Sequence, residues 1–385
     1  MKTEQPIFYL DNAATTFPKP EVVYQAMDHF YRNFGGNAGR GANPLARRAA
    51  TLVDETRTLL KSWLNAPDIV FSPSATIALN TVLLGARLRP GDVVYVTPFE
   101  HNSVLRPLEH LRQTVGIEIQ LIPFDRKTFE CKLDELESLF RLEPPALVCV
   151  TQVSNVIGLA PPVDDILAMA KRIAPQAITI VDGAQAAGLR ELDMSLVDAL
   201  VFSGHKSMYG PYGIAGIAFG RDWRPEPLIF GGTGTQSERV EMPPNGPSRF
   251  ESGSHNTNAV AGLRAAVQWL IDTGREAINT HTHQLTLKMR VALTELSGVT
   301  VYAANDAEHI GIVSFNVDGM TPQTVETALG ANNIAVRAGL HCAPWTHEFI
   351  GTTQLGGAVR TSFGCFSTTE DVNTLVSYLA MLLTY

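Results

Sequence analysis

Ile178-Thr179-Ile180-Val181-Asp182-Gly183-Ala184-Gln185 and Ala199-Leu200-Val201-Phe202-Ser203-Gly204-His205-Lys206-Ser207 are two apolar runs, each followed by a polar turn. If both runs are strands of one parallel sheet, their turns meet at the same edge of that sheet. Asp182 and Lys206 would then lie close together. An amine and a carboxylate at one sheet edge suit pyridoxal phosphate, because a lysine forms a Schiff base with its aldehyde and an aspartate keeps its ring nitrogen protonated.

The same arrangement repeats from residue 69 to about residue 220. Short apolar runs alternate with helical patterns there, which is typical of a parallel α/β sheet. In open sheets of this kind, ligands bind beyond the carboxyl ends of the strands. We therefore expect one site to form from the turns that follow the runs at 69–71, 93–97, 147–151, 178–181 and 200–202.

The rest of the chain predicts additional helices and a smaller α+β unit. Helical patterns begin at Pro20 and at Asn43-Pro44, an N-cap followed by proline at the first helical position. After a Pro- and Gly-rich stretch at 243–248, helices are expected at about 258–272 and 283–296 and from Thr321-Pro322. Strands are expected at 310–317, 334–338 and 358–363, with a closing helix from Asp371. We expect an N-terminal segment over 1–20, a large cofactor-binding domain over 21–257 and a small C-terminal domain over 258–385.

Composition excludes several classes of protein. A chain of 385 residues with 45% hydrophobic and 18% charged residues is typical of a soluble globular enzyme of about two domains. The net charge of −8 disfavours nucleic acid as the main partner. Residues 1–6 lack the features of a signal peptide, and no apolar stretch approaches the roughly 18 residues that cross a membrane. We expect a cytoplasmic protein without a membrane or nucleic-acid partner.

The chain has four cysteines, Cys131, Cys149, Cys342 and Cys365, without C-x-x-C spacing. Structural disulfides are not expected in a large cytosolic protein, and Cys149 lies in an apolar run that predicts a core position. His281-Thr282-His283 is predicted to be helical, where neighbours two residues apart face different directions, so no metal site is expected. Cys342, in His341-Cys342-Ala343, is the candidate for sulfur chemistry.

Taken together, these motifs resemble those of the class V aminotransferase family, specifically the cysteine desulfurases and selenocysteine lyases. The matching motifs are Tyr9-Leu10-Asp11-Asn12-Ala13-Ala14-Thr15-Thr16, Ser74-Ala75-Thr76, Glu100-His101, Asn155, Asp182 with Gln185, Ser203-Gly204-His205-Lys206 and Arg337-Ala338-Gly339-Leu340-His341-Cys342-Ala343. The last is similar to the R-x-G-x-H-C-A motif of the SUF-type, or group II, desulfurases. The resemblance covers nearly the whole chain. It implies a fold type I transferase, with a mainly parallel seven-stranded sheet in the large domain, and a homodimer.

The resemblance also implies roles for the cofactor-binding residues. Lys206 would carry the cofactor and move the Cα proton, Asp182 would pair with the ring nitrogen, and His101 would stack on the ring. Gln185 would hydrogen-bond the ring hydroxyl, and Asn155 would lie beside it. The phosphate would be held by Ala75, Thr76, Ser203, His205 and, from the neighbouring subunit, Ser254, where the family usually has threonine.

The substrate-binding residues follow from the same resemblance. Arg360 and Asn155 would bind the substrate, with Arg360 taking its carboxylate, and Cys342 would attack the substrate sulfur with His341 helping to deprotonate it. The expected reaction converts L-cysteine to L-alanine, with a persulfide on Cys342 for transfer to a sulfur acceptor. Leu340 and Pro344-Trp345-Thr346-His347 depart from the usual SUF-type pattern, which leaves substrate selectivity and partner dependence open.

Two alternatives remain. The same cofactor could serve a selenocysteine lyase, a C–S β-lyase or an aminotransferase that acts on another amino acid. Replacing Cys342 would then leave transamination, or much of selenocysteine cleavage, intact. A sulfur carrier or regulatory module with a decayed site is the other alternative, and the set Lys206, Asp182, His101 and Arg360 argues against it.

Overall fold

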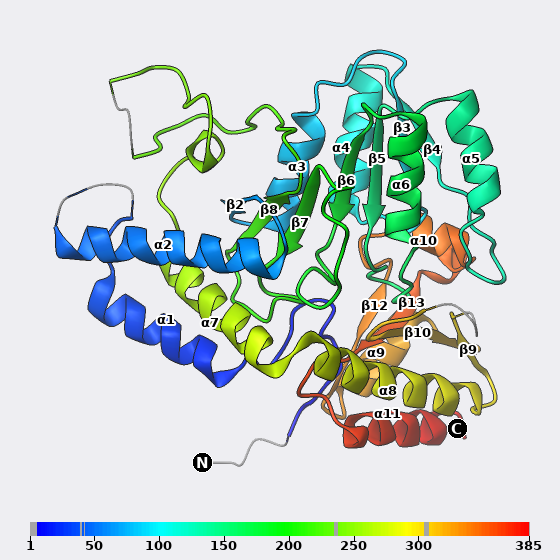
Figure 1. Ribbon diagram of the computed structural model, residues 1–385. Coiled ribbons are helices and arrows are strands. Elements are labelled where there is room, and N and C mark those ends of the chain that lie inside the picture. The colour runs from blue at the N-terminus through cyan, green and yellow to red at the C-terminus, as the bar shows by residue number, and fades with distance from the viewer. Residues whose placement is uncertain (1–5, 39–40, 42, 235–237, 304–307, 385) are drawn as a thin grey trace.

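The computed structural model describes residues 6–38, 41, 43–234, 238–303 and 308–384. Its centre is a seven-stranded sheet in the order β2-β8-β7-β6-β5-β3-β4 (Figure 1). Within this sheet, β8 alone runs against its neighbours, and the expected mainly parallel sheet is confirmed. The strands are β2 (Asp68–Ser72), β3 (Val93–Val96), β4 (Glu118–Leu121), β5 (Leu147–Thr151), β6 (Ile178–Asp182), β7 (Ala199–Ser203) and β8 (Ala215–Phe219).

The sequence pattern located five of these strands and missed β4 and β8. The strand β4 lies at the edge of the sheet and is half-buried to exposed along its length, so it lacks the apolar run of its neighbours. The strand β8 contains Gly216, where an added Cβ would lie 2.5 Å from the ring of Phe202 and from the carbonyl oxygen of Val70. Close packing against both neighbouring strands therefore requires glycine in β8, and glycine weakens the strand signal.

Helices cover both faces of the sheet, which is why its strands are apolar without alternation. Along β5, Leu147 and Cys149 pack into one core and Val148 and Val150 into the opposite core. The first core also contains residues of α3 (Ala75–Leu84) and α4 (Asn102–Thr114), and the second contains residues of α5 (Leu133–Leu142) and α6 (Val163–Ile173). The turns at the carboxyl ends of the strands stay uncovered by these helices.

Three further helices pack together beside the sheet: α1 (Glu21–Phe34), α2 (Pro44–Trp63) and α7 (Thr257–Thr273) (Figure 1). Asn43 caps α2 as predicted, because its side chain accepts a hydrogen bond from the N–H of Ala46 at 2.9 Å. The next helix, α8 (Arg275–Thr294), begins earlier than the predicted residue 283, since Gly274 at φ 84° separates it directly from α7.

The C-terminal part forms a second sheet in the order β12-β13-β10-β9, with α8, α9 (Pro322–Gly330) and α11 (Thr369–Leu382) packed on it. Its strands are β9 (Val299–Val301), β10 (Ile312–Val317), β12 (Arg337–Gly339) and β13 (Ala358–Ser362). The single strand predicted at 334–338 is wrong. Its first half, β11 (Ile334–Ala335), pairs instead with β1 (Phe8–Tyr9), a distant partner that periodicity does not reveal.

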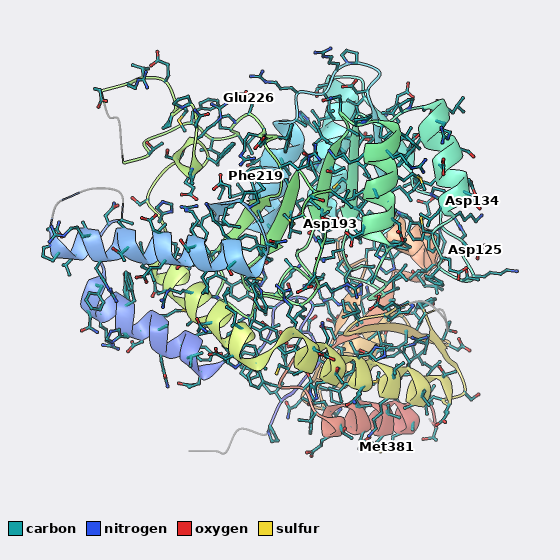
Figure 2. All side chains as sticks on the ribbon, in the orientation of Figure 1. Asp125, Asp134, Asp193, Phe219, Glu226 and Met381 are labelled. Carbon is teal, nitrogen blue, oxygen red and sulfur yellow. The ribbon has the colours of Figure 1, made fainter. Side chains whose placement is uncertain are left out.

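Side chains fill the space between these layers (Figure 2). Phe219, at the end of β8, is fully buried, whereas Met381 of α11 is more than half exposed. Within the described ranges, no helix is long and apolar enough to cross a bilayer. The domain boundaries at residues 20 and 257 stay a prediction, and residues 1–5 of the N-terminal segment lie outside the described residues.

Candidate active site

The turns after β2, β3, β5, β6 and β7 converge on one cavity. Every predicted cofactor-binding residue except Ser254 lines it, namely Ala75, Thr76, His101, Asn155, Asp182, Gln185, Ser203, His205 and Lys206. Ser74, Leu79, Ser103, Thr151, Val153 and Ala184 complete the lining and were not predicted as site residues. Ser103 was detectable, because it lies one residue into the helix that follows His101.

Asp182 is held by the strand ladder at the bottom of this cavity. It ends β6 and pairs with Thr151 of β5 and Val201 of β7, and the residue is 4% exposed. One carboxylate oxygen, Oδ1, accepts a hydrogen bond from the N–H of Ala184 at 3.0 Å. Burial raises the pKa of Asp182, and the Ala184 N–H and nearby Lys206 oppose that rise. A cationic ring nitrogen next to this carboxylate would favour its ionised form.

The turn that carries Lys206 depends on one glycine and on the N-terminal motif. A Cβ on Gly204 would lie 2.5 Å from the carbonyl oxygen of Ile214, so only glycine fits there. The carbonyl of His205 accepts hydrogen bonds from the Thr15 hydroxyl at 2.9 Å and from the Thr16 N–H at 3.1 Å. The close packing of Gly204 against Ile214 and the hydrogen bonds from Thr15 and Thr16 therefore fix this turn from two sides.

Burial lowers the pKa of Lys206 to about 8. This value includes an opposing effect of Asp182 and, to a smaller extent, Cys342, as well as the lowering effect of Arg360 and Arg337. A lysine with a lowered pKa has an appreciable neutral fraction near neutral pH, and only the neutral amine attacks a carbonyl group.

One end of the cavity fits a phosphate. The helix α3 begins there at Ala75, and its cap Ser74 accepts a hydrogen bond from the Ile77 N–H at 3.2 Å. Free N–H groups at such a helix start bind anions. The Nδ1 atom of His205 is buried and has no hydrogen-bond partner within the described part of the chain. This orphaned nitrogen and the helix start together form a donor set for phosphate oxygens.

His101 presents a neutral imidazole to the cavity. It caps α4, and its Nδ1 accepts a hydrogen bond from the Ser103 N–H at 3.0 Å, so the ring hydrogen lies on Nε2. Burial lowers the pKa of His101 to about 4, and Lys206 and Arg106 add to this effect. A neutral imidazole can stack on a flat aromatic ligand. It does not repel that ligand when the ligand carries a positive charge.

Arg360 lies close to Asn155 but does not line the cavity. It belongs to β13 and is 2% exposed. Its Nη1 donates to the Asn155 carbonyl at 2.9 Å, and its Nη2 lies 2.7 Å from Oδ1 of Asp11. Sequence reasoning quoted Asp11 as part of a motif and gave it no role, yet it is the carboxylate that faces Arg360.

Cys342 lies in a tight turn over residues 340–343. The Ala343 N–H donates to the Leu340 carbonyl at 2.9 Å, and the two central residues, His341 and Cys342, have φ angles of 48° and 58°. Two positive φ angles in succession are the type I′ pattern, which costs non-glycine residues on the order of 1–3 kcal/mol each. The surrounding structure must therefore hold this turn.

Two contacts place the turn beside the cavity. The Asn102 N–H donates to the Cys342 carbonyl at 2.6 Å, directly after His101. The Asn155 side-chain amide donates to the His341 carbonyl at 2.8 Å. The Cys342 residue itself is exposed. His341 points inward, with Nε2 2.9 Å from the Ala358 carbonyl, so the geometry gives no support to His341 as a base for the thiol.

Other titratable groups near the site escaped sequence reasoning. Glu100 is fully buried, and its Oε1 accepts hydrogen bonds from the Thr97 hydroxyl at 2.6 Å and the Thr151 N–H at 2.8 Å. Burial raises its pKa to about 8. Lys19 donates to the His205 carbonyl at 2.7 Å, and burial lowers its pKa to about 7. Neither residue type signals burial from sequence alone.

The remaining cysteines lie away from this chemistry. Cys149 is buried in β5, as predicted, and burial raises the pKa values of Cys149, Cys131 and Cys365. All four cysteines are free thiols. Across the described ranges, no three His, Cys, Asp or Glu side chains gather in a way that would hold a metal ion.

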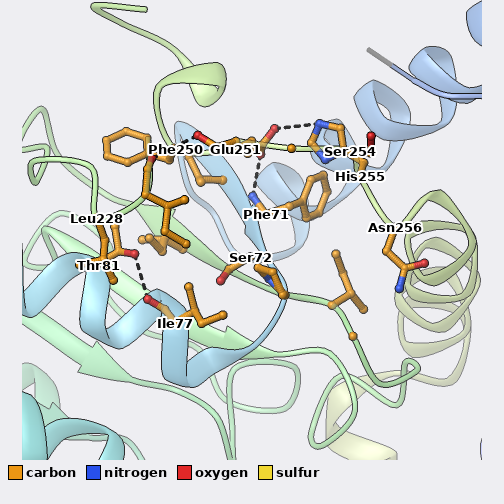
Figure 3. Close-up of a pocket in the computed structure, with 18 of the residues that line it drawn as sticks. Phe71, Ser72, Ile77, Thr81, Leu228, Phe250, Glu251, Ser254, His255 and Asn256 are labelled. Atoms are coloured by element: carbon orange, nitrogen blue, oxygen red, sulfur yellow. Dashed lines mark hydrogen bonds and ion pairs between the residues drawn. The ribbon is translucent and has the colours of Figure 1, made fainter. Parts of the chain in front are cut away.

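Ser254 lies in a second hollow, separate from the cofactor cavity (Figure 3). The loop that carries it is anchored by Glu251, whose carboxylate binds Arg57 through two contacts of 2.8 and 2.9 Å and accepts from the Phe71 N–H at 2.7 Å. Ser254 itself accepts a hydrogen bond from Asn37 at 3.2 Å. Within one chain, this serine is therefore not part of the candidate site.

The fold agrees with comparisons to known proteins. The chain belongs to the class-V aminotransferase family, whose sequence model, described as "Aminotransferase class-V", matches residues 8–375. The expected fold type I architecture is thereby confirmed. The family is pyridoxal-phosphate-dependent.

Three similar proteins carry a more specific name. A "Probable cysteine desulfurase" of Halalkalibacterium halodurans is 34% identical over 97% of this chain and 92% of its own. A "Cysteine desulfurase" of Yersinia pseudotuberculosis is 33% identical, covering 97% of this chain and 93% of its own. The apo structure of a cysteine desulfurase from Thermococcus onnurineus superimposes with a TM-score of 0.91 at 31% identity, covering 98% of this chain and 95% of that one.

Proposed function

We propose that this protein is a pyridoxal-phosphate-dependent cysteine desulfurase that converts L-cysteine to L-alanine and retains the sulfur as a persulfide on Cys342. The observation that carries the proposal is the cavity that gathers Lys206, Asp182 and His101 beside an exposed Cys342. The names of the similar proteins support the same activity.

The residues of the cavity fit the cofactor. Lys206 would attach it through its amine, and Asp182 would hold the ring nitrogen. The helix start at Ala75 and Thr76, together with Ser203 and His205, would bind the phosphate. Pyridoxal phosphate, when bound, supplies an electron sink that weakens the bonds around the substrate Cα and Cβ.

The chain's own groups then manage protons and orientation. A Lys206 amine with a pKa of about 8 can take the Cα proton and return it. Arg360, with Asn155 beside it, would orient the substrate carboxylate, for which a planar guanidinium is well suited. Because Asp11 occupies one edge of that guanidinium, the substrate carboxylate would have to share or replace it.

The sulfur step balances without a further reactant. The Cys342 thiolate attacks the substrate sulfur, an S–S bond forms, and the substrate C–S bond breaks with its electron pair going to Cβ. A proton then replaces the sulfur on Cβ to give alanine. L-Cysteine and the Cys342 thiol thus become L-alanine and a Cys342 persulfide, from which an acceptor thiol removes the sulfur.

The assembly and location stay part of the proposal. We infer a homodimer in which Ser254 of one subunit reaches the phosphate of the other, since within one chain it lies in a different hollow. The protein would act in the cytoplasm with a sulfur-acceptor partner.

The decisive experiment is peptide mass spectrometry after incubation with pyridoxal phosphate and L-cysteine, together with an alanine assay and a Cys342→Ser variant. Persulfide on Cys342, with alanine formed only by the unsubstituted protein, is the expected result. Cofactor on Lys206 without persulfide or alanine would overturn the proposal and favour an aminotransferase or β-lyase for another amino acid. Selenocysteine cleavage that survives in the Cys342→Ser variant would favour a selenocysteine lyase.

A further inference from the structure

Two buried histidines lie on the inner side of the Cys342 turn. His341 is the first central residue of that turn, and His347 belongs to α10 (Pro344–Phe349), which follows it. Their ring centroids are 5.7 Å apart, and the ring planes are tilted by 35°. His347 is fully buried although the mechanism gives it no task. A fully buried imidazole this close to the turn that carries Cys342 is a candidate for a functional role.

Hydrogen bonds assign the ring hydrogens. The His341 Nε2 lies 2.9 Å from the Ala358 carbonyl, so it carries the hydrogen and leaves Nδ1 as an acceptor. The His347 Nδ1 lies 2.7 Å from the Thr352 hydroxyl, which is 3.5 Å from the His347 carbonyl. Because the Leu340 carbonyl acts on the His347 ring as a hydrogen-bond acceptor while Nδ1 faces Thr352, we assign the ring hydrogen of His347 to Nε2, with the Thr352 hydroxyl donating to Nδ1. Burial lowers the pKa of His347 to about 4 and that of His341 well below its usual range, which keeps both rings neutral.

The two remaining nitrogens are complementary. The Nδ1 acceptor of His341 and the Nε2 donor of His347 are both buried, and neither makes a hydrogen bond of normal geometry in the described residues. The Leu340 carbonyl lies close enough to the His347 imidazole to oppose the lowering of its pKa. The donor of His347 is therefore next to an acceptor at the first residue of the turn, the Leu340 carbonyl, and the His347 ring lies beside the ring of His341 at the second.

Hydrogen bonds from other elements already hold the outer side of the same turn. Asn102, at the start of α4, and Asn155, in the turn after β5, donate hydrogen bonds to the carbonyls of Cys342 and His341. The bond from the Ala343 N–H to the Leu340 carbonyl and the contact between His341 Nε2 and the Ala358 carbonyl add to these two bonds, which leaves the inner side of the turn at Leu340 to be held. The His347 ring, fixed by Thr352, fills that inner position.

We propose that His347 is a positioning residue for Cys342: its Nε2–H faces the Leu340 carbonyl, its ring packs beside that of His341, and these contacts hold the turn that presents the thiol at the mouth of the cavity. The catalytic consequence rests on the proposed desulfurase function. The conformational statement does not, because thiol presentation can be measured without turnover.

The test compares His347→Gln, His347→Asn and His347→Leu in the cofactor-loaded protein, with His110→Asn on the exposed face of α4 as a control. A glutamine amide nitrogen reaches the position of Nε2, whereas an asparagine amide reaches only that of Nδ1. The readouts are the alkylation rate of Cys342 by iodoacetamide, followed by peptide mass spectrometry, and kcat and KM for alanine formation. The cofactor absorbance on Lys206 monitors the rest of the site.

We expect His347→Gln and the control His110→Asn to keep the alkylation rate and kcat within about twofold of the unsubstituted protein. The asparagine and leucine variants should change the alkylation rate severalfold and lower kcat by about tenfold to a hundredfold, with KM and the cofactor absorbance unchanged, because a small misplacement of a reacting atom is costly. If the leucine variant does not fold, Thr352→Val, which removes the partner of Nδ1, should shift the same two readouts in the same direction.

Wild-type alkylation and kcat in a folded His347→Leu variant would overturn the proposal. A glutamine variant as impaired as the leucine variant would also overturn it, because the Nε2 donor would then not be the reason. An unsubstituted protein without desulfurase activity contradicts the proposed function alone, and the alkylation rates still decide the role of His347.

Discussion

The molecule positions its two candidate reactive groups in different ways. Lys206 and Asp182 follow the ends of adjacent parallel strands, where the main-chain ladder of β5, β6 and β7 sets their spacing. Cys342 lies in a turn of two left-handed residues held by single contacts from other elements. A ladder distributes its constraint over many hydrogen bonds, whereas the turn depends on a few. Substitutions at the strand ends should therefore remove chemistry without moving the backbone, and substitutions around the turn should move the thiol.

The largest effect is expected for Lys206→Ala, at the end of the ladder. Alanine formation should fall by about 10²–10⁴-fold, the range for losing a positioned acid–base group, and covalent cofactor should disappear. The urea midpoint of the cofactor-free protein should stay the same, because the ladder does not use this side chain. Turnover, cofactor absorbance and urea unfolding check these points. A lowered urea midpoint in the variant would contradict this contrast between the ladder and the turn, because the ladder would then depend on the Lys206 side chain.

The buried carboxyl of Glu100 gives the ladder region a pH dependence. Its pKa in the folded protein, about 8, lies above the value of 4.5 for an unfolded chain. The folded state therefore holds a proton that the unfolded state has lost, and stability falls as the pH rises from about 4.5 to 8 and then levels off. Between pH 5 and 8 this amounts to roughly 4 kcal/mol.

Glu100→Gln should flatten that part of the stability curve, because glutamine keeps the shape and does not titrate. Urea unfolding of the two cofactor-free proteins at pH 5 and pH 8 measures the difference. Parallel curves for both proteins would mean that Glu100 is ionised in the fold at neutral pH.

A smaller effect is expected for Asn155→Ala, which removes the donor to the His341 carbonyl. Leaving this buried carbonyl unpaired should cost about 1–3 kcal/mol in the cofactor-free protein and change the alkylation rate of Cys342. Asn80→Ala removes a comparable bond on the exposed side of α3 and should cost no more than about 0.5 kcal/mol. Equal losses in both variants would show that the turn is no more sensitive than an ordinary helix surface.

The smallest effect is expected for Asp11→Asn. Because Asp11 competes with a substrate carboxylate for Arg360, its neutral analogue should lower KM for L-cysteine by about threefold to tenfold. Cysteamine, which lacks a carboxylate, provides the matched comparison and should bind as before. A higher KM for L-cysteine, with cysteamine unaffected, would mean that Asp11 helps Arg360 to bind the substrate.

The same contrast explains what the sequence could predict. The placement of Lys206 and Asp182 at one edge of the sheet was predictable because apolar runs mark strands and parallel strands end at one edge. Those local signals also located α2 and its cap. Edge and glycine-containing strands, β4 and β8, escaped because their patterns are weak.

Features that depend on distant partners were not predictable. The split between β11 and β12 requires β1, and the partner of Arg360 is 349 residues away. The burial of His347 and Glu100 depends on the final packing, and neither residue type indicates burial by itself. The sequence therefore predicted which candidate residues gather at the sheet edge better than it predicted what holds the Cys342 turn.

The pairing of Asp11 with Arg360 has a consequence for biosynthesis. The two residues are separated by 349 positions, so at 5–20 residues per second the ribosome adds Arg360 roughly 20–70 s after Asp11. The seven strands of the large sheet, all within residues 68–219, are synthesised well before that. A nascent chain can thus form the sheet and the turn that carries Lys206 before Arg360, the partner of Asp11, has been synthesised. The pocket that we propose for the amino-acid carboxylate would then be completed only near the end of translation, so incomplete chains would lack it.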